Sequence, residues 1–280
     1  MNYHKFSHSY KRNGLIGVLN VLLGKIGVKS RIKSSIELRI IWIANYIKRF
    51  TNNTVNTGLY KGMKIHNNIF WSQKDISTRL LGLYELEVQN IILKIQSISK
   101  IKKKYLINIG GGDGYHAVGL LRSKIFQKSI IFEIDNRGQN IISINLDINN
   151  QKNKAKILGE AKKDFLTTDL KSIKLDECFF LIDIEGMEHS LLDKTNLDKL
   201  ANSILLVELH AIQPKSLEKF MKLLKNRYDV KEFYTESRDL SKINFMHDLE
   251  DNDRWLAVSE HRGSMMSWVA CIPKKNKFNF

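Results

Sequence analysis

The middle of the chain is marked by runs in which nearly every position is apolar. These runs lie within Tyr105–Ile109, Ile130–Phe132, Phe179–Ile182 and Ser203–His210. Such a run is typical of a strand buried on both faces of a parallel sheet. Stretches with apolar residues at helical spacing separate the runs. The pattern therefore predicts an α/β fold with a mostly parallel sheet.

The end of the chain departs from this alternation of strand and helix. A helix is predicted over Lys215–Arg227 and a strand over Tyr228–Tyr234. The last strand, Met265–Ile272, follows a long polar segment rather than a strong helix. The chain is therefore predicted to end on two strands without a strong helix between them.

Helical patterns precede the first strand. Apolar residues recur at helical spacing from Ile36 to Phe50, and Leu80–Ile101 is predicted to form one helix that packs on the sheet. We divide the chain into a basic, partly helical extension over residues 1–75 and a main domain over residues 76–280.

A glycine-rich segment follows the first strand. Its glycines are Gly110, Gly111, Gly112 and Gly114, and a helix pattern and a second strand ending at Glu133 come next. Glycines let the backbone approach a ligand closely, and the following helix offers free N–H groups. An acid at the tip of the second strand can bind a ribose diol. This order of elements predicts a nucleotide-type cofactor site.

The glycines alone leave three interpretations open. Gly112, Gly114 and Ala117 fit the dinucleotide fingerprint G-x-G-x-x-G/A. The same segment reads as G-x-G-x-G from Gly110 to Gly114. A glycine-rich turn without a ligand is the third interpretation.

Polar side chains stand just beyond two of the buried strands. Asp183 and Glu185 follow the strand that begins at Phe179, and Glu208 and His210 end the next one. Ligands of such sheets bind outside the carboxyl ends of the strands. These four side chains are therefore the candidates for chemistry.

Three motifs resemble S-adenosylmethionine-dependent methyltransferases. The G-x-G-x-G segment resembles motif I of the class I enzymes. Ile182–Glu188 (IDIEGME) and Val207–His210 (VELH) resemble the corresponding pieces of the FkbM family. The resemblance extends over roughly residues 80–273 and favours S-adenosylmethionine over a dinucleotide.

The resemblance implies a Rossmann-like class I methyltransferase fold. Its seven-stranded sheet is mostly parallel, with a terminal antiparallel strand pair, and here it carries an N-terminal helical extension. The residues expected to contact S-adenosylmethionine are Asn108, Gly110, Gly112, Gly114, Glu133, Ile134, Glu160, Ala161 and Asp183. Asn108 stands where the class usually has an acid, and it keeps an acceptor oxygen without the charge.

Transfer of a methyl group to a hydroxyl requires a base. His210 is the first choice for this catalytic role, because the ordinary pKa of histidine lies near neutrality. Asp183, Glu185 and Glu208 complete the catalytic candidates. The four side chains could also gather a divalent cation, but we assign no metal from the sequence.

The expected function is O-methylation of a sugar, a glycan or a secondary-metabolite hydroxyl. An RNA methyltransferase is the alternative enzyme. The chain lacks the N-P-P-Y or D-P-P-Y type of motif, however, and the sequence that starts at Asp183 reads D-I-E-G instead. A cofactor-binding but inactive scaffold is the third hypothesis, and Asn108 favours it.

The net charge of +16 is spread along the chain. Lys supplies 34 of the 45 basic residues, whereas phosphate recognition favours Arg, so the charge is weak evidence for a nucleic-acid partner. Nothing in the sequence specifies an oligomeric state. Cys178 and Cys271 are isolated and suit a reducing interior, so we expect a cytoplasmic protein.

Residues 1–50 are more unevenly charged, with ten Lys or Arg and one acid, Glu37. Basic amphipathic helices can lie on anionic membranes. Their apolar faces can equally pack on the main domain or on a second subunit. Peripheral membrane contact through residues 1–50 therefore stands beside the packing interpretation.

Overall fold

Seven strands form one sheet in the computed structural model, which describes residues 3–26, 33–67, 74–98, 102–210 and 214–276. The side chains of residues 3–13 and 214 are outside this description. The strands are β1 (Tyr105–Ile109), β2 (Lys128–Phe132), β3 (Ala155–Leu158), β4 (Cys178–Ile182), β5 (Ile204–Leu209), β6 (Tyr228–Tyr234) and β7 (Ser267–Pro273).

The strand order is β3-β2-β1-β4-β5-β7-β6. Neighbours among β1 to β5 pair in parallel, and β7 runs antiparallel to both β5 and β6. The order reverses at β1, so the carboxyl ends of β1 and β4 flank the switch point where open α/β sheets bind ligands. The predicted sheet with its terminal antiparallel pair is confirmed.

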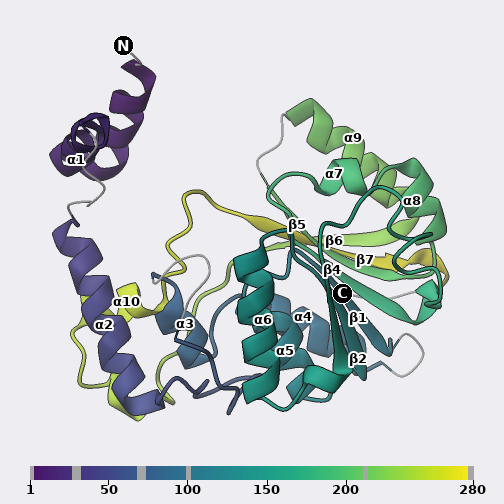
Figure 1. Ribbon diagram of the computed structural model, residues 1–280, viewed down its shortest axis with the longest axis horizontal. Coiled ribbons are helices and arrows are strands. Elements are labelled where there is room, and N and C mark those ends of the chain that lie inside the picture. The colour runs from purple at the N-terminus through teal and green to yellow at the C-terminus, as the bar shows by residue number, and fades with distance from the viewer. Residues whose placement is uncertain (1–2, 27–32, 68–73, 99–101, 211–213, 277–280) are drawn as a thin grey trace.

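Helices cover both faces of the sheet (Figure 1). One face packs against α4 (Leu86–Gln96), α5 (Tyr115–Arg122) and α6 (Asn136–Ile148), and the other packs against α8 (Lys194–Lys199) and α9 (Pro214–Lys225). The remaining helices are α1 (Tyr3–Lys25), α2 (Ser35–Thr51), α3 (Ile76–Leu81), α7 (Glu188–Leu191) and α10 (Asp251–Val258). Short 3₁₀ turns lie at Lys152–Lys154, Leu175–Glu177, Asn244–Met246 and Lys274–Asn276.

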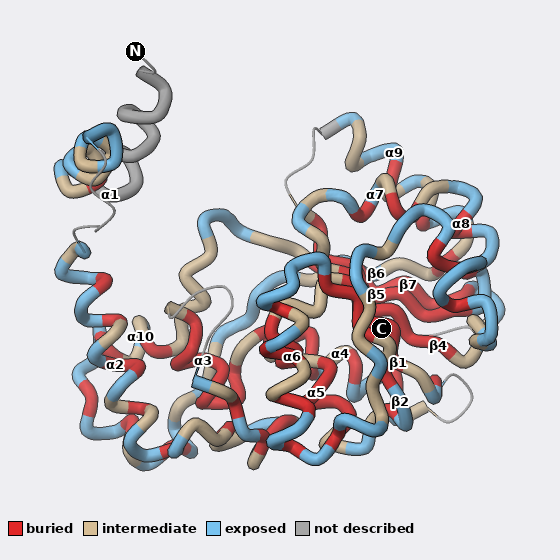
Figure 2. Tube along the Cα trace, in the orientation of Figure 1, coloured by how far each residue is buried: buried red, intermediate tan, exposed pale blue. Residues whose placement is uncertain are grey.

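Buried residues concentrate in the strands and on the inner sides of the helices (Figure 2). Every residue of β4 and β5 is buried. Both strands consist mostly of apolar residues, as expected for strands covered on both faces. The two central strands therefore give a rigid support to the polar side chains that follow them.

Helix α2 confirms the helical pattern that starts at Ile36. It begins with a capping box in which the Ser34 hydroxyl accepts from the Glu37 N–H and the Glu37 carboxylate accepts from the Ser34 N–H. Ile40, Ile43 and Ile47 are buried against α3 and α10. The apolar face of this helix is therefore largely covered by the main domain.

The predicted helix over Leu80–Ile101 is interrupted, which corrects the sequence analysis. Helix α3 ends at Gly82, α4 starts only at Leu86, and residues 99–101 lie outside the described part. Gly82 and Glu85 both have positive φ angles, 82° and 45°. The left-handed conformation of Gly82 ends a helix readily, and the break turns Glu85 into the interior, where its side chain is buried.

Among the described residues, each helix is too short or too polar to cross a membrane. Helix α1 lies apart from the sheet in Figure 1. Its exposed apolar side chains are Leu15, Leu19 and Leu22, and Ile26 follows directly after it.

Candidate functional site

The glycine loop, residues 110–114, lies over the end of β2. The N–H groups of Gly110 and Gly111 both donate to the Phe132 carbonyl at 2.9 Å. Gly110 has a φ of 85°, and a Cβ there would strike the Asp183 carbonyl oxygen. Only glycine fits this position. The loop is thereby held against the ends of β1, β2 and β4.

The Glu133 carboxylate holds the same loop by accepting hydrogen bonds from backbone N–H groups. One of its carboxylate oxygens accepts from the Gly112 N–H at 2.7 Å, and the other accepts from the Asp135 N–H at 2.9 Å. The side chain is buried. A carboxylate has about four lone-pair sites, so each oxygen keeps room for a ribose hydroxyl. Glu133 can therefore hold the loop in place and bind a ligand at the same time.

A cavity with about 450 Å³ of empty space opens beside the loop at the ends of β1 and β4. This space includes open solvent, and the enclosed part of the cavity amounts to only about 60 Å³. Of the predicted residues, Asn108, Gly110, Gly112 and Asp183 line it. The other lining residues include Arg79, Tyr84, Glu85, Tyr115, His116 and Trp268.

The remaining predicted cofactor residues lie outside this lining. Gly114 starts α5, and Ile134 follows Glu133 with 72% of its surface exposed. Glu160 and Ala161 come just after β3, which pairs with β2. Ile134, Glu160 and Ala161 thus follow the ends of the neighbouring strands β2 and β3, beside the cavity at β1 and β4.

Asn108 is buried at the floor of the cavity. Its amide nitrogen lies 3.4 Å from the Leu181 carbonyl oxygen and 3.5 Å from that of Gly110. These are long hydrogen bonds. The side chain is therefore weakly held and can turn its oxygen or its nitrogen towards a ligand.

Four carboxylates surround His210 at the ends of β4 and β5. We call this group, Asp183, Glu185, Glu188, Glu208 and His210, the His210 cluster. His210 Nδ1 lies 2.8 Å from Glu188, and Nε2 lies 3.5, 3.4 and 3.7 Å from oxygens of Asp183, Glu185 and Glu208. The structure thus brings together all four predicted catalytic residues and adds Glu188.

The charges of the cluster act on each other. Burial works to lower the pKa of His210, but the hydrogen bond and charge of Glu188 and the charges of Glu208 and Glu185 outweigh it and raise the pKa. Burial raises the pKa of Asp183 well above its usual value, and the neighbouring Glu208 adds to this effect. Asp183 and His210 therefore bind protons more tightly than the same groups would in water, whereas, against the effect of burial, the hydrogen bond from His210 helps to lower the pKa of Glu188.

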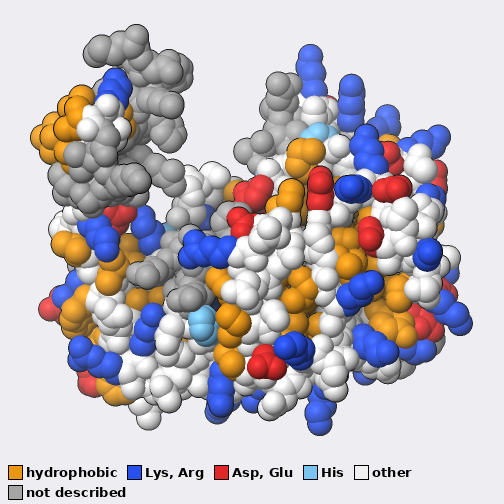
Figure 3. Space-filling view, in the orientation of Figure 1, with side chains coloured by type: hydrophobic (Ala, Val, Ile, Leu, Met, Phe, Trp, Pro, Cys, Tyr) orange, Lys and Arg blue, Asp and Glu red, His pale blue; other side chains and the backbone are white. Residues whose placement is uncertain are grey.

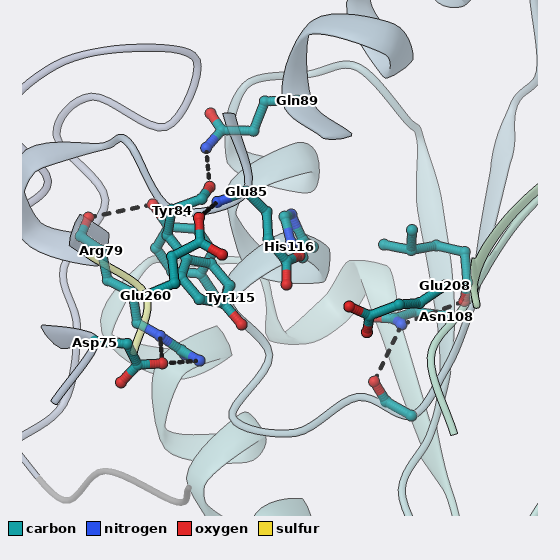
Figure 4. A network of polar contacts seen from close by, with 12 residues as sticks. Asp75, Arg79, Tyr84, Glu85, Gln89, Asn108, Tyr115, His116, Glu208 and Glu260 are labelled. Carbon is teal, nitrogen blue, oxygen red and sulfur yellow. Dashed lines mark hydrogen bonds and ion pairs between the residues drawn. The ribbon is translucent and has the colours of Figure 1, made fainter. Parts of the chain in front are cut away.

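A second polar network, missed by the sequence analysis, includes Glu85 and His116 of the cavity lining, and Figure 4 shows these two residues together with Glu208 and Glu260. Glu85 lies 2.6 Å from His116 Nε2, and its N–H donates to Glu260 at 2.9 Å. Arg262 pairs with Glu85, Glu208 and Glu260. We call Glu85, His116, Glu208, Glu260 and Arg262 the Arg262 network. Glu208 belongs to both groups and links them.

The left-handed backbone of Glu85 supports a functional role for this network. A non-glycine residue with a φ of 45° is uncommon, and such strain often occurs at functional sites. Burial works to raise the pKa of Glu85, but the hydrogen bond to His116 and the charge of Arg262 lower it to about 2. Glu85 is therefore a fixed negative charge on the wall of the cavity.

No family model matches the chain, and no curated protein matches it in sequence. Among solved structures, it is similar to an O-methyltransferase from Bacillus cereus in complex with SAH, with 10% identity, 91% of this chain and 96% of that chain covered, and a TM-score of 0.44. It is similar to the human methyltransferase 10 domain containing protein, with 14% identity, 85% and 98% coverage and a TM-score of 0.44.

A third likeness is to precorrin-6y C5,15-methyltransferase from Geobacter metallireducens, with 12% identity, 67% and 88% coverage and a TM-score of 0.42. The fold assignment rests on the strand order rather than on these likenesses. The fold is that of class I methyltransferases. Its glycine loop, acid at the tip of β2 and cavity at the switch point form a candidate site for a nucleoside-containing cofactor.

Proposed function

We propose that the chain is an FkbM-type methyltransferase that transfers the methyl group of S-adenosylmethionine to a hydroxyl of a sugar, a glycan or a secondary metabolite. The single observation that carries this proposal is the position of Asp183, which lines the cavity beside the glycine loop and also belongs to the His210 cluster. A cofactor over the loop would place its methyl group next to a group of proton acceptors.

In this proposal the nucleoside lies along the edge of β2 and β3. Glu133 binds the ribose, the exposed Ile134 packs against the base, and Glu160 and Ala161 border it. Asn108 and the loop residues Gly110, Gly112 and Gly114 hold the methionine part. S-adenosylmethionine supplies a methyl group that is already electrophilic, so the protein needs to align the acceptor and exclude water.

The acceptor hydroxyl lies over the His210 cluster and loses its proton there. Glu188 orients the imidazole through Nδ1, which leaves Nε2 facing the acceptor side. His210 is the proposed base, with Asp183, Glu185 and Glu208 as the other candidates. The Lys and Arg side chains are scattered over the face in Figure 3 rather than gathered in one patch, which favours a small acceptor over RNA.

The test is transfer of a labelled methyl group from S-adenosylmethionine to panels of small hydroxyl compounds, oligosaccharides and RNA. With a working acceptor, His210→Ala lowers turnover by about 10²–10⁴-fold and leaves cofactor affinity nearly intact. His189→Ala is the matched control, because His189 is exposed on the neighbouring helix α7 and should keep full activity.

Three results would each contradict part of the proposal and favour a different conclusion. Transfer only to RNA would favour the RNA methyltransferase. Cofactor binding without transfer to any panel would favour an inactive scaffold. Full activity of His210→Ala would move the base to Glu185 or Glu208.

A further inference from the structure

The distances around His210 Nε2 are too long for strong hydrogen bonds but suit a metal ion. Three carboxylate oxygens, of Glu185, Asp183 and Glu208, lie 3.4, 3.5 and 3.7 Å from this nitrogen. Ligands at about 2.1 Å from one ion are roughly 3.0 to 3.4 Å apart for octahedral or tetrahedral angles. The three oxygens therefore stand around Nε2 at close to the spacing expected between ligands of one ion.

The imidazole is already oriented for such a role. Its Nδ1 lies 2.8 Å from Glu188, and that same carboxylate oxygen accepts from the N–H groups of Ile184 and Gly186 at 3.1 and 3.2 Å. A histidine that ligates a metal almost always donates its other N–H to a carboxylate, a carbonyl or water. Glu188 meets this requirement and is fully buried.

Two buried oxygens in the same place lack a hydrogen-bond partner. They are Oδ1 of Asp183 and Oε2 of Glu188. One oxygen of each carboxylate and one ring nitrogen of His210 lie within 4.8 Å of one another. Buried polar atoms without partners are rare in folded proteins. An ion bound by Asp183 and His210 would satisfy the Asp183 oxygen.

The charge balance supports a cation as well. Among the described residues, the ion pairs of Asp183, Glu185 and Glu188 lead only to His210, and Glu208 is paired in addition with Arg262. Four carboxylates thus share one imidazole and part of one guanidinium. Excess negative charge at a partly buried site is costly unless it is compensated.

We propose that the His210 cluster binds a divalent first-row metal ion, such as Mn²⁺. His210 Nε2, Asp183, Glu185 and Glu208 are its ligands, and Glu188 is a positioning residue that holds the imidazole. One imidazole among carboxylates suits Mn²⁺, Fe²⁺ or Zn²⁺ better than Mg²⁺, which rarely uses dedicated protein cages.

The position of the ion would explain how an acceptor is held. Asp183 also lines the cavity, so the ion lies beside the expected position of the methyl group. A hydroxyl bound to the metal would lose its proton more easily. This role rests on the proposed function, whereas binding of the metal does not. With the metal bound, His210 is a ligand and no longer the base, and the second oxygen of the exposed Glu185 carboxylate takes the proton of the hydroxyl.

The experiment titrates full-length protein, first treated with a chelator, with Mn²⁺ alone and follows free Mn²⁺ by electron paramagnetic resonance. Zn²⁺ is tested in parallel by calorimetry. We expect one saturable site per chain for at least one of the two ions. His210→Ala and Asp183→Asn should weaken it at least about tenfold, and Glu188→Gln should weaken it about 10–100-fold.

His189→Ala serves as the control and should bind the metal like the unchanged protein. Circular dichroism and thermal melting of each variant report whether it folds. Binding that is unchanged in folded His210→Ala and Asp183→Asn, or no saturable binding of either ion at about millimolar concentration, would overturn the proposal. Because the titration contains neither cofactor nor acceptor, a protein that binds the metal but transfers no methyl group would fail the proposed function alone.

Discussion

Glu133 is the residue on which the cofactor assignment depends most directly. Its two carboxylate oxygens already hold Gly112 and Asp135. Glu133→Ala should weaken S-adenosylmethionine binding by about 1.5–3 kcal/mol, the range for hydrogen bonds to charged groups. Calorimetric titration measures this loss, and thermal melting shows how much comes from a loosened loop.

Two variants make this prediction specific. Glu133→Gln keeps an acceptor oxygen and should lose less affinity than Glu133→Ala. Asp147→Ala on the exposed side of α6 should change nothing, since its ion pair within the described part of the chain is a 3.9 Å contact with Lys152. Equal affinities in Glu133→Ala and the unchanged protein would remove Glu133 from the site.

Arg262 is the single cation that joins three buried carboxylates, Glu85, Glu208 and Glu260. Removing one partner of a buried ion pair costs about 3–5 kcal/mol, because the other charge stays behind unpaired. Arg262→Ala should lower the free energy of unfolding by about this amount in urea titrations. Arg254→Ala, which removes an exposed pair with Asp251, should cost less than about 1 kcal/mol. Similar losses in the two variants would contradict the role of the network.

At the scale of elements, the break between α3 and α4 buries Glu85, and the stability of the fold therefore depends on pH. Glu85 has a pKa of about 2 in the folded protein against 4.5 for an unperturbed glutamate. Its contribution is therefore complete above about pH 4.5 and is lost as the pH falls towards 2. It amounts to on the order of 3 kcal/mol.

Unfolding in urea at several pH values tests this contribution. Glu85→Gln should be clearly less stable than the unchanged protein near neutral pH. The difference between the two should shrink as the pH falls below about 4.5. A difference that stays constant down to about pH 3 would show that Glu85 is not held by His116 and Arg262.

The elements differ in how well the sequence predicts them. Strands β1, β4 and β5 follow from local apolar runs, because burial on both faces leaves a continuous signal. Helix α10 was missed, since its segment begins with polar residues such as Asp251 and Asp253. Gly82 inside the pattern of Leu80–Ile101 was the available sign of a helix break.

The same difference applies to the site. The glycine loop, Glu133 and the His210 cluster stand at strand ends, so topology alone brings them together. Glu85, His116 and Arg262 are far apart in sequence and belong to a helix break, a helix and the segment before β7. Only tertiary packing brings these three residues together, and no local sequence pattern predicts their contact.

At the scale of the whole molecule, the N-terminal extension has two halves with different surroundings. Helix α2 buries Ile40, Ile43 and Ile47 on the main domain, whereas α1 exposes Leu15, with 73% of its surface accessible. Contact with an anionic membrane is therefore proposed for the segment before Lys33. Each Lys or Arg near such a surface contributes about 1 kcal/mol, and salt screens it.

Flotation with anionic vesicles at low salt tests this contact. The full chain should float, and a shortened chain that begins at Lys33 should not. A chain that begins at Thr51 should aggregate, because it lacks the α2 residues that complete the core. If the full and the Lys33 chains behave alike, the extension has no membrane role.

Calorimetric titration of the full-length protein with S-adenosylmethionine and with NAD tests most directly whether the site at the end of β1 binds S-adenosylmethionine. We expect one saturable site for S-adenosylmethionine per chain, weakened in Glu133→Ala, and much weaker or no binding of NAD. Tighter binding of NAD, or no binding of S-adenosylmethionine by the folded protein, would contradict it.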